Sequence, residues 1–305
     1  MDKLNPLVTI AIPTFNQERY IETAITSALN QDYPNLEIIV CDDNSTDRTF
    51  EMINKIRDPR VKIYRTTSNL GRVANYRYIL YQLAKGDWMV MLDGDDYYSD
   101  PTFISGALKQ VNEDPDLVMY VAAASSLIEN SGELVPAPIF LKHQLTKLKG
   151  LDYVLGFYKY GAIGQHFAVI YKRSLALATN FYSLDSLGAD TDSICRLALK
   201  GFVLIEKKWV GVWRSHGNNA SYTLSVTNVD KEVKMLRSIA DEALKYGEEK
   251  RIETWFKENA LKKRKTAIYE YVKTLPKIPA LKILIRNWTW SKQDFKEVVK
   301  KVIRY

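Results

Sequence analysis

The stretch WMVMLDGDD, residues 88–96, decides the fold that we expect for this chain. Five apolar residues, too few for a helix, run directly into three acidic residues and a glycine. This order is typical of a buried strand that presents polar side chains at its carboxyl end. Similar short apolar runs stand earlier in the chain, at residues 7–12, 36–41 and 61–64.

Amphipathic segments separate these apolar runs. Apolar residues recur at helical spacing over residues 21–29, and shorter stripes follow at 52–56 and 73–84. Strands and helices in alternation predict an α/β fold, with a mixed, mainly parallel sheet flanked by helices. Ligands bind such sheets at the carboxyl ends of the strands.

The later part of the chain is less regular. We expect a helix, a strand and a turn over residues 103–132, and loops with short helices over 133–165. A strand at 167–171 and a helix over 190–200 should follow. The many Gly, Asn, Ser and Thr residues in 211–228 predict a mobile loop.

Composition excludes several classes of protein. The 305 residues are 46% hydrophobic and 26% charged, which is ordinary globular usage. Two cysteines and three histidines are too few for a disulfide framework or a Cys/His zinc site. The start of the sequence lacks the pattern of a signal peptide, and no apolar stretch is long enough to span a bilayer. We therefore expect a cytoplasmic protein.

The net charge of +7 is unevenly distributed. Residues 231–305 hold 20 Lys and Arg against 10 Asp and Glu, so the preceding residues are net acidic. This asymmetry argues against nucleic acid as a partner and favours an acidic site with a separate basic surface. We expect one α/β domain over residues 1–228 and a basic helical C-terminal region over 229–305.

The acidic residues after the strand at 88–92 suggest a cation site. Asp93, Asp95 and Asp96 repel one another unless a cation lies among them, and an all-oxygen site suits Mg²⁺ or Mn²⁺. An acidic surface turn is the alternative. A second acidic segment, residues 42–45, follows another strand, although it could simply cap a helix. Both segments, and residues 13–16, should open onto the same edge of the sheet.

Together these segments resemble the family 2 glycosyltransferases, which have a nucleotide-diphospho-sugar-binding GT-A fold. The resemblance runs over about residues 7–221. Its motifs are VTIAIPTFN at 8–16, DDNSTD at 42–47, NLGRVANY at 69–76 and the Asp-x-Asp segment DGDD at 93–96. The resemblance implies a nucleotide-binding half over 1–100 and an acceptor half over 101–228.

The resemblance also implies roles for single residues. Thr14 and Asp43 would hold the base, Asp93 the ribose, and Asp95 the metal that bridges the diphosphate. The expected nucleotide site comprises Pro13, Thr14, Asn16, Asp43, Asn69, Arg72, Asp93 and Gly94. Two of these have other readings: Arg72 could be a solvent-exposed helix cation, and Asn69 could be part of a turn.

The segment GADTDSICRLALKG, residues 188–201, matches the family segment that carries the general base. Asp190 aligns with that base, while Ala189 stands where the family usually has Glu. Asp190 could instead cap the helix, and Asp192 could be the base or could pair with Arg196.

Two further segments extend the resemblance. WRSHGNN, residues 213–219, is similar to the loop that folds over the donor, which implies that His216 lies near the metal or the diphosphate. The alternative is a solvated His216. His166 is expected to be structural. The apolar, aromatic and basic residues of 276–305 could contact an anionic membrane, the catalytic domain or a second subunit.

The resemblance implies an inverting, metal-dependent glycosyltransferase that uses Mn²⁺ or Mg²⁺, a hexosyl- or hexosaminyltransferase. Its donor would be a nucleotide-diphospho-sugar, by family habit a UDP-sugar. Its acceptor would be a saccharide or a lipid-linked saccharide in bacterial surface polysaccharide synthesis, at the inner face of the cell membrane. The alternatives are a non-catalytic sugar-nucleotide-binding protein and a nucleotidyltransferase.

Overall fold

The computed structural model describes residues 5–157, 160, 165–217, 219 and 229–273. The chain divides into two compact units. The first holds residues 1–185 and 189–217, and the second holds 186–188 and 218–305. The predicted boundary between residues 228 and 229 stays a prediction.

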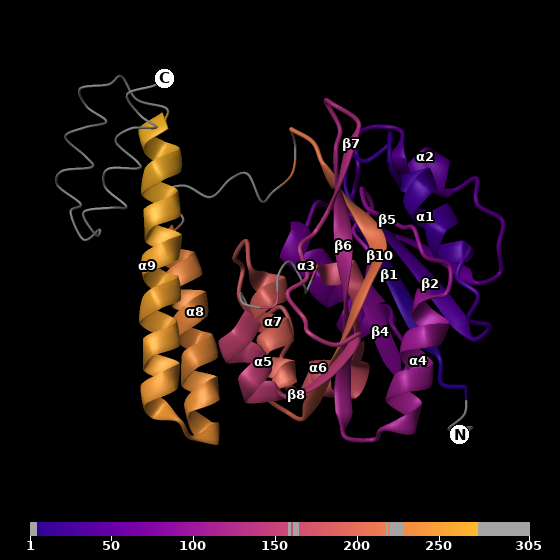
Figure 1. Cartoon of the computed structure of the whole chain (residues 1–305). Helices are drawn as coiled ribbons and strands as arrows, with labels where there is room; N and C mark the ends of the chain where they lie inside the picture. The colour runs from indigo at the N-terminus through magenta and orange to yellow at the C-terminus, as the bar shows by residue number, and fades with distance from the viewer. Residues whose placement is uncertain (1–4, 158–159, 161–164, 218, 220–228, 274–305) are drawn as a thin grey trace. The chain divides into compact units, whose positions relative to one another are not determined.

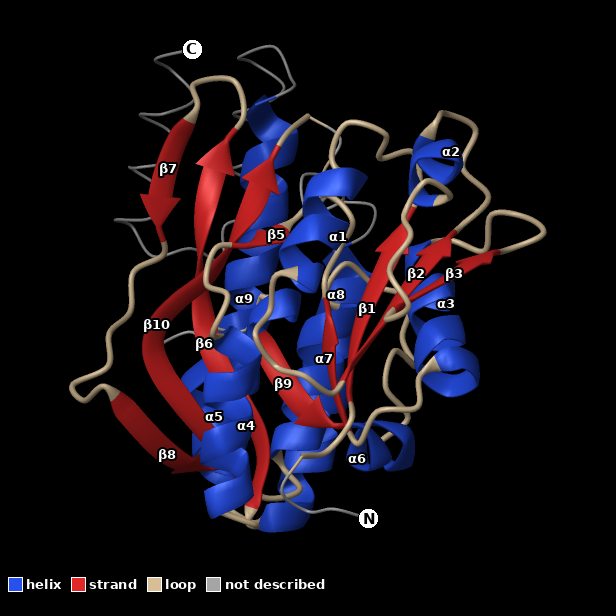
Figure 2. Cartoon of the chain, turned by 90° about the vertical axis from the view of Figure 1, so that its right-hand side faces the viewer, coloured by secondary structure: helices blue, strands red, loops and turns tan. Residues whose placement is uncertain are grey.

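Four parallel strands form one half of the sheet in the first unit (Figure 2). They are β1 (Val8–Thr14), β2 (Leu36–Asp42), β3 (Val61–Arg65) and β4 (Trp88–Met91). All four were predicted as strands. Every residue of β1, β2 and β4 is buried, as expected of central parallel strands covered on both faces.

The helices between these strands also follow the sequence pattern. They are α1 (Ile21–Leu29), α2 (Thr49–Ile53) and α3 (Arg72–Tyr78), which continues as a π-helical turn over Ile79–Leu83. The apolar stripe of α1 is buried as predicted. Helix α2 is shorter than its stripe suggested, because it ends before Ile56.

The other half of the sheet mixes parallel and antiparallel strands. Its elements are β5 (Tyr97–Tyr98), α4 (Phe103–Glu113), β6 (Leu117–Ile128), β9 (Val169–Lys172), α6 (Arg173–Ala178), α7 (Ala189–Ala198) and β10 (Phe202–Ser215). The strand order is β3-β2-β1-β4-β9-β6-β10-β5, with β9 antiparallel to both β4 and β6. Helices α1 and α4 cover one face and α3, α6 and α7 the other (Figure 1). The expected mixed, mainly parallel α/β fold is confirmed.

Two sequence-based predictions need correction. Residues 211–215 are not a mobile loop but the end of β10, which pairs with β6 and β5. Gly211 marks a close approach: a Cβ there would lie 2.6 Å from the Phe167 ring and 2.7 Å from the Tyr97 carbonyl oxygen. Residues 216, 217 and 219 of the predicted loop are described and are not part of a strand. Residues 218 and 220–228 lie outside the described residues.

The second correction concerns residues 133–165. They hold two strands, β7 (Glu133–Pro136) and β8 (Leu145–Lys149), besides helix α5 (Gly150–Gly156). Strand β7 pairs with β6 and β8 pairs with β10, both antiparallel. Both strands lie off the main path of the sheet and are largely exposed, so they lack the apolar runs by which the buried strands were found.

The second unit contains α8 (Val229–Ala243) and α9 (Glu249–Lys273), which pack against each other. The helical pattern expected in this region is confirmed here. Arg237 of α8 bridges the two helices through an ion pair of 2.8 Å with Glu253. Among the helices that the structure describes, none has the length and apolarity that crossing a bilayer requires. The rest of the predicted basic helical region, residues 274–305, lies outside the described residues.

Candidate active site

The loops after β1, β2 and β4 meet at one edge of the sheet, as the sequence predicted. The Asp43 amide donates to the Thr14 carbonyl at 2.8 Å, and the Gly94 amide donates to the Pro13 carbonyl at 3.1 Å. Asn16, at φ 53°, ties its loop to the next one, because its side-chain oxygen accepts from the Thr46 amide at 2.8 Å. Main-chain bonds thus hold these three strand ends together.

Gly94 occupies a position with no room for a side chain. An added Cβ would lie 2.9 Å from the Thr14 hydroxyl and would collide with the Gln17 side-chain amide. The Thr14 hydroxyl itself donates to Gln17 Oε1 at 2.6 Å. The loop that carries Asp93 and Asp95 therefore runs directly over Thr14 and Gln17.

Asp43 organises the loop before α3. Its two carboxylate oxygens accept from the Thr66 hydroxyl at 3.0 Å and from the Leu70 and Gly71 amides at 2.8 and 2.9 Å. Asn69 is exposed in this loop, and Gly71 has φ 89°, a conformation that favours glycine. A carboxylate accepts about four hydrogen bonds, so Asp43 retains capacity for one more. Its predicted contact with the base stays a prediction.

Asp93 lies behind this loop and contacts helix α3. The Tyr76 hydroxyl donates to Asp93 Oδ1 at 2.6 Å. Burial and then the neighbouring Asp95 raise the pKa of Asp93 to about 7, although the Tyr76 hydrogen bond and Arg72 act to lower it. Burial and Asp95 therefore favour the protonated form of Asp93 more than in an ordinary carboxyl group.

Arg72 is half-buried and faces acidic groups, so the reading as a solvent-exposed helix cation is wrong. Its guanidinium carbon lies 5.5 Å from the centre of the Tyr76 ring. Burial lowers the pKa of Arg72, but Tyr76, Asp190 and Asp93 together raise it above its ordinary value. The cation is thus near two of the carboxylates that the sequence singled out.

Asp95 and His216 form a close pair. His216 Nε2 lies 3.0 Å from Asp95 Oδ2, and only 8% of the histidine side chain is exposed, so the reading as a solvated histidine is wrong. The His216 ring stacks on Tyr20 with 5.0 Å between ring centres and 16° between planes. Tyr20 in turn donates to Glu129 at 2.7 Å.

Asp96 anchors the strand that carries His216. It is buried and accepts from the Arg214 amide of β10 at 3.0 Å. The Arg214 guanidinium lies 5.2 Å from the Tyr20 ring centre and 4.7 Å from that of Tyr97. The sequence did not predict the roles of Tyr20 and Tyr97, because their ring contacts join segments that are far apart in the chain.

The side chains of Asp95 and His216 are suitable ligands for a divalent cation. Mg²⁺ and Mn²⁺ take few protein ligands and complete their coordination with water and substrate phosphates. Asp95 and His216 offer one carboxylate and one imidazole at the same point. Within the described ranges, no three or more His, Cys, Asp or Glu side chains gather into a metal site. Asp95 and His216 would fill two positions around such a cation and leave the others to water or phosphate oxygens.

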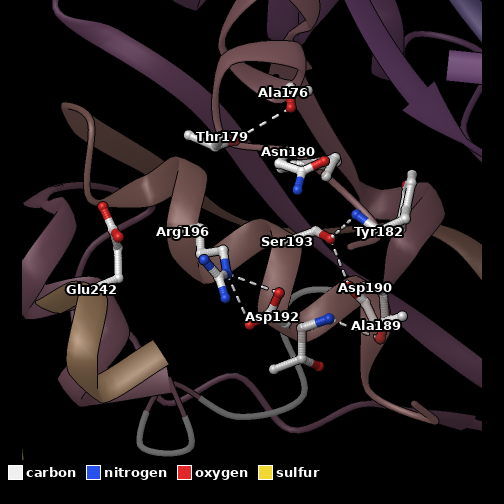
Figure 3. A network of polar contacts seen from close by, with 12 residues as sticks. Ala176, Thr179, Asn180, Tyr182, Ala189, Asp190, Asp192, Ser193, Arg196 and Glu242 are labelled. Carbon is white, nitrogen blue, oxygen red and sulfur yellow. Dashed lines mark hydrogen bonds and ion pairs between the residues drawn. The ribbon is translucent and has the colours of Figure 1, made fainter. Parts of the chain in front are cut away.

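Asp190 lies at the start of α7, and its Oδ1 accepts from the Thr191 amide at 2.8 Å. It is close enough to Arg72, Asp93 and His166 to influence the pKa of each. Figure 3 shows Asp190 in the turn beside Ala189.

Asp192 has a different environment. It is buried and forms an ion pair with Arg196 one helical turn later, at 2.9 Å, as one reading of the sequence anticipated (Figure 3). Burial raises the pKa of Asp192 although Arg196 acts to lower it. The Asp192 carboxylate is thus paired within its own helix, whereas Asp190 interacts electrostatically with Arg72 and Asp93.

Residues 9–175, more than half of the sequence, match the model of glycosyl transferase family 2. The chain belongs to this family. Relatives of this family 2 glycosyltransferase include enzymes of bacterial polysaccharide synthesis. The chondroitin synthase of Pasteurella multocida is 30% identical over 235 residues, which cover 75% of this chain and 22% of that protein. An Escherichia coli UDP-Glc:alpha-D-GlcNAc-diphosphoundecaprenol beta-1,3-glucosyltransferase is 42% identical over 92 residues, 30% of this chain and 36% of that one.

This family 2 glycosyltransferase thus spans well under half the length of these curated relatives. Among solved structures, Staphylococcus aureus TarS 1–349 in complex with UDP-GlcNAc is similar with a TM-score of 0.67. The sequence identity is 17%, and the match covers 98% of this chain and 90% of that one. The expected GT-A fold is thereby confirmed.

Proposed function

We propose that this chain is an inverting, metal-dependent glycosyltransferase of bacterial surface polysaccharide synthesis. The donor would be a nucleotide-diphospho-sugar, most simply a UDP-sugar, and the acceptor a hydroxyl of a saccharide or lipid-linked saccharide. The observation that carries the proposal is the proximity of Asp93 and Asp190 to Arg72, with Asp95 beside Asp93. Asp93 and Asp95 lie in the loop after β4 and Asp190 lies in α7, so the fold itself brings them together.

The donor half of the site follows from the strand ends. Pro13, Thr14 and Asn16 would line the base together with Asp43, and Asp93 would accept the ribose hydroxyls. Arg72 is placed to contact a phosphate, because a guanidinium presents several donors to phosphate oxygens. Asp95 and His216 would hold Mn²⁺ or Mg²⁺, and the bound cation neutralises charge on the departing diphosphate.

The acceptor half depends on Asp190. Its Oδ1 accepts the Thr191 amide, which fixes the carboxylate, and we assign Oδ2 to the proton of the attacking hydroxyl. The hydroxyl oxygen bonds to the anomeric carbon as the bond to the diphosphate oxygen breaks, and its proton passes to Asp190. A single displacement of this kind inverts the anomeric configuration.

Exchange of one carboxylate oxygen tests this assignment. In Asp190→Asn the amide cannot accept the proton, so we expect turnover to fall by at least about a hundredfold, the lower bound of general-base contributions. UDP affinity, measured by calorimetry with Mn²⁺, should stay within about twofold, because the nucleotide contacts lie on other elements. Asp185→Asn, on a residue outside the proposed machinery, is the matched control. Turnover of Asp190→Asn near that of the parent protein would refute the assignment.

A non-catalytic sugar-nucleotide-binding protein is the second candidate. It is favoured by Ala189, a fully buried methyl group where the family usually has a glutamate. Release of UDP from a panel of UDP-sugars, with and without Mn²⁺ and with candidate acceptors, separates the two. Nucleotide binding without any release in every combination would favour the binding protein.

The basic C-terminal region supports a proposal about location. Residues 276–305 could bring the enzyme to the anionic inner face of the membrane, where lipid-linked acceptors are found, or could join two subunits. Flotation with anionic vesicles, with and without these residues, tests the membrane contact. Equal flotation of both forms would refute the membrane contact. Light scattering of the same two forms tests whether these residues join two subunits.

A further inference from the structure

Three aromatic residues form a buried cluster next to the candidate active site, and the reaction outlined above uses none of them directly as reactants. We name Tyr76, His166 and Tyr182 the His166 cluster; each is at most 5% exposed. The Tyr76 ring centre lies 5.2 Å from the centres of both other rings, with interplanar angles of 66° and 56°. Edge-on and tilted contacts of this kind are favourable and fix ring orientation.

Two members of the cluster, His166 and Tyr182, are paired with each other. His166 Nε2 lies 2.5 Å from the Tyr182 hydroxyl, a hydrogen bond whose direction depends on the histidine tautomer. Burial lowers the pKa of His166 to about 4, Asp190 acts to raise it and Arg72 to lower it further. Burial also raises the pKa of Tyr182. Both side chains are therefore neutral at physiological pH and can serve as fixed dipoles.

The cluster touches both parts of the proposed reaction centre. At one end the Tyr76 hydroxyl donates to Asp93 at 2.6 Å. At the other end the Tyr182 amide donates to the Ser193 hydroxyl at 2.8 Å, and that hydroxyl donates to the Ala189 carbonyl at 2.7 Å (Figure 3). Ala189 and Ser193 bracket Asp190 in the first turn of α7. A continuous set of contacts thus links the carboxylate after β4 to the turn that carries Asp190.

The backbone at Tyr182 is strained. It has φ 58°, and Asn180 has φ 53°, in the left-handed region that is uncommon for a bulky side chain. Such conformations persist only where the surroundings enforce them, and they concentrate at functional sites. Here Arg77 enforces the geometry: its Nη1 donates to Asn180 Oδ1 at 3.2 Å and to the Phe181 carbonyl at 2.9 Å. Arg77 lies on α3, the helix that also carries Arg72 and Tyr76.

We propose that His166 and Tyr182 are positioning residues, which fix the distance between Asp190 and the donor held by Asp93. The proposal rests on the proposed role of Asp190. An acceptor hydroxyl must meet both its base and the anomeric carbon at close range, and errors near 1 Å in such geometry cost about a hundredfold in rate. Helix α7 and strand β4 lie far apart in the chain, so a rigid buried pair between them supplies that precision.

Removal of a single oxygen tests the proposal. In Tyr182→Phe the ring and the backbone remain, and we expect kcat to fall about tenfold, because the segment that holds Ser193 of α7 through the Tyr182 amide loses its hydrogen bond to His166. The donor KM and the affinity for UDP should stay within about twofold. Tyr171→Phe is the matched control, because its hydroxyl is also buried and lies 3.5 Å from that of Tyr182 but contacts neither carboxylate; its kcat should stay within about twofold.

A double-mutant cycle distinguishes positioning from a general loss of structure. If Tyr182 acts through Asp190, then Tyr182→Phe added to Asp190→Glu should lower kcat by less than about twofold further. His166→Gln, which can still hydrogen bond to Tyr182, should retain more activity than His166→Phe. An unchanged kcat in Tyr182→Phe, or losses that multiply in the cycle, would overturn the proposal while Asp190→Asn stays inactive. Full activity of Asp190→Asn would instead overturn the proposed function, and this inference with it.

Discussion

In Tyr76→Phe, the decrease of kcat/KM for the donor at low pH should begin at a higher pH than in the parent protein. Burial and Asp95 raise the pKa of Asp93 to about 7, and the hydrogen bond from Tyr76 opposes them. We expect the ionised form of Asp93 to hold the ribose, so kcat/KM for the donor falls as the pH falls through this pKa. Without the tyrosine hydroxyl the pKa of Asp93 rises, and the loss begins at higher pH.

The size of the pKa shift of Asp93 follows from the free energy of the hydrogen bond that Tyr76 donates to it. A hydrogen bond to a charged group contributes about 1.5–3 kcal/mol, and one pKa unit corresponds to about 1.4 kcal/mol. Water can partly replace the hydroxyl of Tyr76, so we expect the acid limb to move up by about one pH unit.

The assay is kcat/KM for the nucleotide sugar from pH 5.5 to 9 at constant Mn²⁺, which reports groups of the free enzyme. Tyr81→Phe is the control, because its hydroxyl lies 3.4 Å from Asn180 and Phe181 and does not contact Asp93. The quantity compared is the midpoint pH of the acid limb, because the plateau above it also reports the lost contact between the His166 cluster and Asp93. An acid limb that stays in place in Tyr76→Phe, or moves to lower pH, would refute the reasoning.

The remaining predictions concern metal, packing and stability. His216→Ala should raise the Mn²⁺ concentration for half-maximal activity by at least about tenfold, whereas alanine at the exposed His143 should not change it. Gly94→Ala should lower the free energy of unfolding by about 1–3 kcal/mol, seen in urea titrations, and weaken UDP binding in calorimetry, because its Cβ displaces Thr14. Arg196→Met leaves the buried carboxylate of Asp192 without its ion pair. Because Arg196 is already 20% exposed, we expect the free energy of unfolding to fall by about 2 kcal/mol and the melting temperature to fall by about 4–8 °C. Both decreases should be smaller at low pH, where Asp192 is protonated.

The outcomes that would contradict these three are distinct. An unchanged Mn²⁺ requirement in His216→Ala would remove that histidine from the metal site. Gly94→Ala with normal stability would mean that the loop tolerates a methyl group. A melting temperature of Arg196→Met equal to that of the parent protein would show that the ion pair contributes nothing net to stability.

The first half of the sheet could be predicted from the sequence because its signals are local. Central parallel strands are buried on both faces, so β1, β2 and β4 stand out as short apolar runs between helical stripes. The acids that follow β2 and β4 had to reach one edge once the strands were parallel. Convergence of Thr14, Asp43 and Asp93 therefore required no knowledge of distant contacts.

The second half carries signals that depend on tertiary packing. The composition of residues 211–228 predicts a loop at Gly211, yet this residue is glycine because Phe167 and Tyr97 leave no space for a side chain. The exposed strand β8 alternates without a long apolar run. Likewise, the chain pattern does not show that the Tyr20 ring stacks on His216, because the two are almost 200 positions apart.

The His166 cluster shows the same limit for function. His166 was expected to be structural, and its burial agrees with that expectation. Its contact with Tyr182, and the link through Ser193 to α7, exist only in the fold. Sequence alone gives the residue types at a site, whereas their mutual distances decide which of them can act together.

A crystal structure with UDP and Mn²⁺, with anomalous scattering recorded for manganese, tests the central claim most directly. The account predicts one manganese peak within coordination distance of Asp95 and of the diphosphate, with Asp93 on the ribose and Asp190 facing the vacant sugar position. Nucleotide bound away from the ends of β1, β2 and β4, or a manganese peak remote from Asp95, would contradict it.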